Sequence, residues 1–219
     1  PLQSLLRKLG YDGDGRHPAK RRLVFLGDLV DRGPDSPGVL ELVMRLVGNG
    51  TAQCILGNHE MNLLRNDRKH GNDWYTRPEA ADPTEAICES EQQKRRFHRF
   101  LLTLPLALQN EQLRVVHACW HGESLERIAA LEDGTDALAA FELFDAQTIA
   151  AHESNFALRA QAQKELDALN ADLSDHDVVP PFLSANAAID AAWQMGNPIR
   201  VLTSGVETPT AAPFYAGGK

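Results

Sequence analysis

Two short polar blocks contain the side chains with the clearest chemistry. Residues 27–33 read Gly-Asp-Leu-Val-Asp-Arg-Gly, and residues 57–60 read Gly-Asn-His-Glu. A third apolar run ends at His117. Carboxylate, amide and imidazole groups bind divalent cations, and an arginine holds phosphate oxygens with a planar pair of N–H groups. This combination of residue types predicts metal-assisted hydrolysis of a phosphate ester.

Apolar runs in front of the blocks predict the elements that position them. Residues 23–26 and 52–56 are typical of short buried strands, and the segment between them has the apolar periodicity of a helix. Together they predict a parallel, right-handed β-α-β unit. Ligands gather beyond the carboxyl ends of parallel strands, so we expect Asp28, Asn58 and His117 to meet at one edge of the sheet.

Asp28, Asn58 and His117 are the candidate metal ligands. The Asp28 carboxylate has two oxygens and can bridge two cations. The amide oxygen and the imidazole complete a mixed ligand set that suits Mn, Fe or Zn better than Ca. Two such ions about 3.5–4 Å apart can hold a phosphate and activate a water molecule for attack.

Asp31, Arg32 and His59 are the candidate catalytic residues. Asp31 can fix the tautomer of His59, and a protonated His59 can act as general acid toward the departing oxygen. Arg32 offers phosphate a planar fork that lysine would not reproduce. Glu60 is either part of the site or a charge favoured in the first turn of a helix. The competing interpretations are strand-end turns for both blocks, a core histidine for His117 and a structural salt bridge for Arg32.

Several other elements follow from apolar periodicity and capping residues. Ser36 and Pro37 are the predicted N-cap and first residue of the helix inside the β-α-β unit. Residues 66–84 are polar and predict an exposed loop near the site. The remaining predicted elements are helices at residues 2–9, 85–104 and 184–193, and strands at residues 113–116 and 200–203.

Composition restricts the classes of partner. The net charge is −8, with 30 acidic against 22 basic residues, which disfavours nucleic acid and anionic membranes but not a small phosphorylated substrate. No apolar run approaches the roughly 20 residues that span a bilayer, and the first residues do not resemble a secretory signal. Three widely spaced cysteines predict no disulfide framework and a cytoplasmic protein, with Cys54 in the core.

The two blocks closely resemble signature motifs of the calcineurin-like metallophosphoesterases. More narrowly, they are similar to the phosphoprotein-phosphatase branch, which includes bacterial Ser/Thr phosphatases and symmetrical diadenosine-tetraphosphate hydrolases. Residues 115–117, Val-Val-His, resemble the third motif. The resemblance implies an α/β fold in which a β-sandwich is flanked by helices. It also implies two bound metals with Asp28 as the bridge, Asn58 and His117 on one metal, His59 with Asp31 as the acid, and Arg32 as the phosphate clamp.

The resemblance is strong over residues 1–121 and thin afterwards. The Gly-Asp-x-His-Gly motif that opens the family and a late Gly-His pair do not occur here, so we expect a single metallophosphoesterase domain at residues 1–219 that is shortened at both ends. Residues 124–200 are rich in Ala, Leu and Glu and predict a largely helical insertion within that domain. Residues 118–121, Ala-Cys-Trp-His, replace the usual small residues of the third motif, and His121 is an alternative ligand.

The leading hypothesis is a bacterial-type metallophosphatase that acts on phosphomonoesters, including phosphoproteins. Mn is the expected metal, with Fe, Zn or Mg as alternatives. A second hypothesis is cleavage of a dinucleoside polyphosphate or a cyclic nucleotide, since the same metals serve either reaction. The pocket formed by residues 66–84 and 124–200 would discriminate between these substrates. From a different class, the chain is a binding or regulatory module without catalysis, an idea motivated by the missing first motif.

Overall fold

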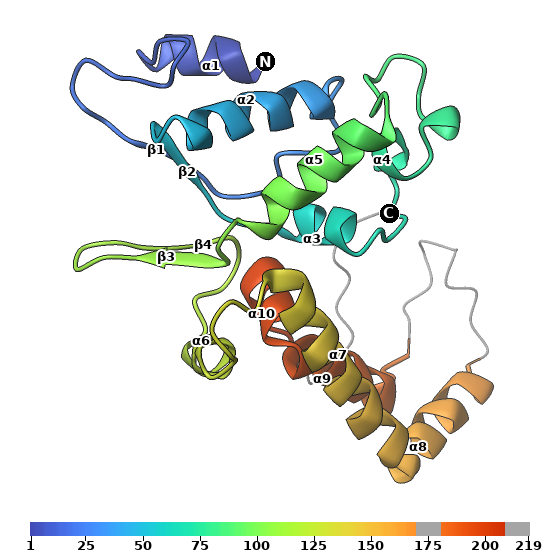
Figure 1. Cartoon of the computed structure of the whole chain (residues 1–219). Coiled ribbons are helices and arrows are strands. Elements are labelled where there is room, and N and C mark those ends of the chain that lie inside the picture. Colours follow the sequence, from blue (N-terminus) through green and yellow to red (C-terminus); the bar gives the residue numbers. More distant parts are fainter. Residues whose placement is uncertain (170–180, 209–219) are drawn as a thin grey trace.

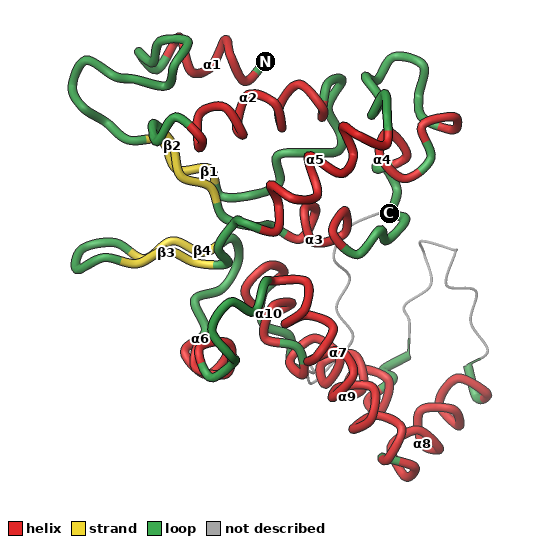
Figure 2. Tube along the Cα trace, in the orientation of Figure 1, coloured by secondary structure: helices red, strands yellow, loops and turns green. Residues whose placement is uncertain are grey.

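The computed structural model describes residues 1–169 and 181–208, which form a mixed α/β structure with substantial helix (Figures 1 and 2). The first half contains α1 (Leu2–Lys8), β1 (Leu23–Phe25), α2 (Ser36–Gly48), β2 (Ala52–Cys54), α3 (Asn58–Leu64), α4 (Asp73–Thr76), the 3₁₀ turn η1 (Pro78–Ala80) and α5 (Glu91–Leu102). The second half contains β3 (Ala107–Gln109), β4 (Arg114–Val116), α6 (Gly122–Ala129), α7 (Ala137–Ser154), α8 (Phe156–Asp167), α9 (Ser184–Gly196) and α10 (Pro198–Ser204). The predicted α/β class is confirmed.

The predicted β-α-β unit is present. β1 and β2 pair in parallel, with Leu23 opposite Ala52, and α2 connects them. The prediction of Ser36 as N-cap is wrong by one residue, because the Asp35 carboxylate accepts the Gly38 N–H over 2.8 Å. Asp and Ser cap helices about equally well, so sequence could not rank the two neighbours. Ser36 is left free to serve the adjacent turn.

β3 and β4 do not extend the parallel pair. They form a separate antiparallel hairpin, with Ala107 opposite Val116, so the expectation that the third strand ends at the same sheet edge is wrong. The chain just before the hairpin still contacts the chain just after β2, because the Leu56 N–H donates to the Pro105 carbonyl over 3.0 Å. Each sheet has two strands among the described residues, and the β-sandwich arrangement is not confirmed.

Residues 200–203 are helical rather than a strand. They lie in α10, which begins after Asn197, whose side chain accepts the Ile199 N–H over 3.0 Å. Pro198 occupies the first helical position, where its missing N–H costs nothing. A short apolar run does not distinguish a buried strand from a buried helix, and here the capping residues decide.

The segment at residues 66–84 is largely exposed or half-exposed, as predicted, but it is not loop throughout. It contains α4, in which Trp74 and Tyr75 are each only 1% exposed. The helix predicted at residues 85–104 is shorter, because Ser90 caps α5 through the Gln93 N–H. Within the segment between α3 and α5, α4 therefore packs into the protein, while most of the other residues stay exposed or half-exposed.

Helices α6 to α10 confirm the predicted helical character of the described part of residues 124–200, while residues 170–180 lie outside the described ranges. In Figure 1, α7, α8 and α9 extend away from the half that carries β1 and β2. Glu165 of α8 accepts the N–H groups of Ala185 and Asn186 at the start of α9. The Ala185 N–H is the main group that lowers the pKa of Glu165, to about 2. That this segment is an insertion stays a prediction.

The main core lies where α2, α3, α5 and α7 meet. Phe141 of α7 belongs to this core, and two guanidinium groups lie over its ring. That of Arg65, just after α3, lies 4.2 Å from the ring centre, and that of Arg200 in α10 lies 5.2 Å from it. Cys54 is buried as predicted, and burial raises its pKa to about 12. All three cysteines are free. No helix among the described residues has the length and apolar character to cross a membrane.

Candidate active site

The two motif turns pack directly against each other. A Cβ atom at Gly27 would lie 2.4 Å from the Gly57 backbone nitrogen, so only glycine permits this approach. Gly27 has a φ of 85°, and Asp28, Asp31 and Arg32 also have left-handed φ values of 50°, 67° and 56°. Non-glycine residues in this region cost energy and persist where surrounding contacts hold them, which is common at functional sites.

Glu60 holds the two turns together from inside. Its carboxylate is fully buried and accepts the N–H groups of Gly57 and Asp28, each over 2.9 Å, and of Leu29 over 2.8 Å. Burial raises the pKa of Glu60 above its ordinary value, while these N–H donors oppose that shift. Of the two interpretations of Glu60, the geometry supports a structural one, in which a buried carboxyl group in the first turn of α3 positions the two turns.

Replacing Glu60 with alanine is expected to destabilise the fold by about 3 kcal/mol. Three N–H groups would lose their acceptor, and each buried unsatisfied donor costs about 1–3 kcal/mol, less where water can enter. Denaturant unfolding curves measure the change. Glu41→Ala is the control, because Glu41 is half-exposed in an ion pair with Arg96 and such surface pairs contribute at most about 1 kcal/mol. Equal losses in the two variants would contradict the role given to Glu60.

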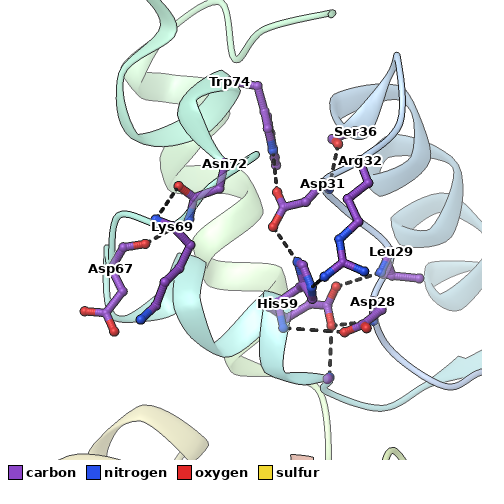
Figure 3. Close-up of polar contacts among 12 residues, drawn as sticks. Asp28, Leu29, Asp31, Arg32, Ser36, His59, Asp67, Lys69, Asn72 and Trp74 are labelled. Carbon is purple, nitrogen blue, oxygen red and sulfur yellow. Dashed lines mark hydrogen bonds and ion pairs between the residues drawn. The ribbon is translucent and has the colours of Figure 1, made fainter. Parts of the chain in front are cut away.

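The predicted catalytic residues are brought together (Figure 3). His59 Nδ1 lies 2.5 Å from Asp31 Oδ2, and the Asp31 side chain is fully buried. An ionised carboxylate only accepts, so the proton between them belongs to Nδ1. Arg32 Nη2 lies 3.4 Å from His59 Nε2 on the other side of the ring. The three residues predicted as acid, orienting carboxylate and phosphate clamp therefore form one connected group.

Two further contacts to Asp31 were not predicted from sequence. The Trp74 indole N–H donates to Asp31 Oδ1 over 2.7 Å, and the Ser36 hydroxyl accepts the Asp31 N–H over 3.0 Å. The only sequence signal for Trp74 is a pair of aromatic residues inside an otherwise polar segment. For Ser36 the sequence favours the capping interpretation instead, because a hydroxyl at the start of a helix commonly caps it.

Two of the three predicted metal ligands face each other. Asp28 Oδ1 lies 3.4 Å from His117 Nε2, and the other nitrogen of His117 contacts the Leu26 carbonyl. Two ligands about 2.1 Å from one ion lie roughly 3–3.5 Å apart, so this pair fits two positions on a single cation. The Leu26 contact is the kind of second contact that fixes the orientation of a ligating histidine.

Asn58 lies in the same turn as the other candidate ligands. It is the first residue of α3, between Gly57 and His59, whose backbone N–H is 3.5 Å from Asp28 Oδ1. Within residues 1–169, no hydrogen bond joins the Asn58 side chain to Asp28 or His117. The described ranges also contain no group of three or more His, Cys, Asp or Glu side chains placed to hold a metal ion. The donor pair fits a cation, and the described carboxylates, imidazoles and thiols do not by themselves complete its coordination.

The alternative ligand, His121, serves another purpose. It is the N-cap of α6, and its Nδ1 lies 2.8 Å from the hydroxyl of Ser124, whose backbone N–H it also accepts. These contacts account for the nitrogen that faces the helix. His117, which contacts Asp28, remains the better candidate.

Comparison with known proteins gives one family and several partial relatives. The sequence model of the calcineurin-like phosphoesterases matches residues 2–179. Over 67 residues the chain is 48% identical to the asymmetrical bis(5'-nucleosyl)-tetraphosphatase PrpE of Oceanobacillus iheyensis, covering 29% of this chain and 27% of that protein. Over 64 residues it is 48% identical to the symmetrical bis(5'-nucleosyl)-tetraphosphatase of Ralstonia nicotianae, covering 29% of this chain and 20% of that protein. The matched segments thus span less than a third of the length of these relatives, 27% and 20%.

Proposed function

This chain belongs to the calcineurin-like phosphoesterase family, whose members use divalent metal ions, and from that premise we propose that it acts as a metal-dependent hydrolase of phosphoric esters. The observation that carries the proposal is the single cluster of His59, Asp31 and Arg32 beside the facing pair of Asp28 and His117. A binding module without catalysis would not need a buried carboxylate aligned with an imidazole. The β-sandwich and the cytoplasmic location remain parts of the proposal.

In this proposal Asp28, Asn58 and His117 would hold the cations. Two divalent ions, with Mn expected and Fe, Zn or Mg as alternatives, would neutralise phosphate charge and activate water. Asp28 is half-exposed, so its carboxylate is accessible from solvent, whereas His117 is mostly covered. The Leu26 carbonyl keeps the His117 ring directed at Asp28.

His59, Asp31 and Arg32 act on the leaving group and the phosphate. A guanidinium only donates, so His59 Nε2 faces Arg32 as an acceptor in the structure. A phosphate oxygen placed between the two would take over as acceptor from Arg32 and would let a protonated Nε2 face the ester oxygen. His59 would then donate its proton as that oxygen departs, while Asp31 keeps the ring aligned.

A dinucleoside polyphosphate is the substrate class that the relatives favour. Two of them carry the name bis(5'-nucleosyl)-tetraphosphatase, one asymmetrical and one symmetrical. We therefore propose this class as a substrate beside phosphomonoesters and phosphoproteins. Cyclic nucleotides have no such support. Nucleic acid and membranes are not proposed as partners, because the net charge of −8 opposes binding to either polyanion.

Chelation tests the proposal directly. We expect hydrolysis of p-nitrophenyl phosphate or diadenosine tetraphosphate to vanish after treatment with EDTA and to return on addition of Mn²⁺. The ratio of the two rates distinguishes a monoesterase from a polyphosphate hydrolase. Hydrolysis that survives complete metal removal, or no hydrolysis of either substrate with any of the four metals, would refute the proposed function.

A further inference from the structure

Trp74 is a buried aromatic residue whose only polar side-chain atom is directed at Asp31. The two residues are 43 positions apart, and their hydrogen bond of 2.7 Å involves Asp31 Oδ1. The other oxygen, Oδ2, contacts His59. In Figure 3 the indole and the imidazole reach the carboxylate from different elements, α4 and α3. Each oxygen of this buried carboxylate therefore has its own donor.

We propose that Trp74 is a positioning residue that holds the Asp31 carboxylate in the orientation in which it aligns His59. The torsion that rotates a carboxylate about its last bond has a broad, roughly two-fold preference, so one donor alone fixes the group poorly. A second donor on the opposite oxygen fixes its plane. The indole is neutral and rigid, so it supplies this constraint without adding a positive charge that would compete with His59.

The backbone on both sides of this contact is held independently. The Asp31 N–H donates to Ser36, which fixes the backbone and leaves the carboxylate plane to Trp74. Trp74 itself is tied to the chain before α5, because its carbonyl accepts the Cys88 N–H over 2.9 Å. The turn before α4 is braced by Asn72, which is fully buried and accepts the Lys69 N–H. The backbone of Trp74 is thus held in place by these hydrogen bonds, as a positioning role requires.

A purely structural role for Trp74 is the competing explanation. Its ring makes an edge contact with Tyr75, with centres 5.4 Å apart, and both residues are equally buried. Loss of the indole could therefore act through packing alone. Tyr75→Leu supplies the matched control, because it disturbs the same helix and core while leaving the contacts of Asp31 intact.

The inference rests on the proposed function, and its first test is a rate comparison. Trp74→Phe keeps an aromatic ring but removes the N–H. We expect it to slow the hydrolysis of esters with poor leaving groups about 10–100-fold, the usual effect of losing such an outer partner, and to slow activated esters much less. In an Asp31→Ala background, Trp74→Phe should cause no further loss. Tyr75→Leu should affect both ester types alike. If Trp74→Phe behaves like Tyr75→Leu, the positioning role is wrong.

The second test does not depend on activity. In ¹⁵N NMR spectra we expect the Trp74 indole proton to exchange slowly and to lose its downfield position in Asp31→Ala. We also expect the His59 ring to be a single Nδ1–H tautomer in the wild type and a mixture in Trp74→Phe. An indole signal that ignores Asp31→Ala, or an unchanged His59 tautomer, would overturn the inference. A protein that hydrolyses no ester yet shows both spectral changes would refute the proposed function and leave the positioning contact established.

Discussion

Changing Asp28 to asparagine is expected to reduce metal-dependent turnover to the background rate. The substitution keeps the shape of the side chain but removes the negative charge that faces His117 over 3.4 Å. Metal ions contribute several kcal/mol to a transition state, and about 1.4 kcal/mol corresponds to a factor of ten, so we expect a loss of at least about 10²–10³-fold. Turnover measured across a Mn²⁺ titration, together with calorimetry of Mn²⁺ binding, checks the result.

Asp35→Asn is the matched control for this experiment. It makes the same chemical change seven residues away, at the N-cap of α2, where asparagine caps as well as aspartate. We expect it to retain both metal binding and turnover. Should Asp28→Asn bind Mn²⁺ with unchanged affinity, Asp28 is not a ligand, whatever its effect on rate.

Replacing His59 with asparagine is expected to slow esters with poor leaving groups by about 10²–10⁴-fold and to spare metal binding. The magnitude is that of general acid catalysis, and the selectivity follows because good leaving groups depart without a proton. His59 contacts Asp31 and Arg32 through its side chain, so its loss removes no proposed ligand. A series of aryl phosphates of increasing leaving-group pKa measures the effect.

A histidine elsewhere on the protein controls for nonspecific effects. His98 of α5 contacts the Leu64 carbonyl and lies outside the cluster, so His98→Asn should leave the slope of the aryl phosphate series unchanged. The general-acid role would be wrong if His59→Asn released the metals but kept the wild-type dependence on the leaving group. In that case His59 would be closer to a ligand than to an acid.

The part of the site that could be predicted from the sequence is formed by elements that are consecutive in the chain. β1, α2 and β2 are consecutive in the chain, and a parallel pair joined by one helix must place the turns after its strands side by side. Asp31 and His59 follow those turns, so their proximity could be expected from spacing. The 2.5 Å contact between them agrees with that expectation.

The unpredicted parts depend on contacts that leave no periodic signal. Trp74 meets Asp31 through a packed segment whose polar composition resembles an exposed loop. His117 follows a strand of an antiparallel hairpin. The sequence could not predict this pairing, because nothing in a three-residue strand specifies the direction of its partner. Residues 200–203 are apolar enough for either a strand or a helix, and burial against α6 and α7 suits both. In each case tertiary packing decided what the local pattern left open.

Phe141 makes helices α6 to α10, here called the helical arm, difficult to remove from the protein. A shortened version that stopped before residue 124 would leave Arg65, at the end of the helix that begins with the second motif, without the aromatic face it now covers. It would also strip the Leu202 carbonyl from the Ala118 N–H, one residue past His117. Engineers who seek a minimal catalytic unit should therefore keep the arm, because it contacts residues next to those that form the site.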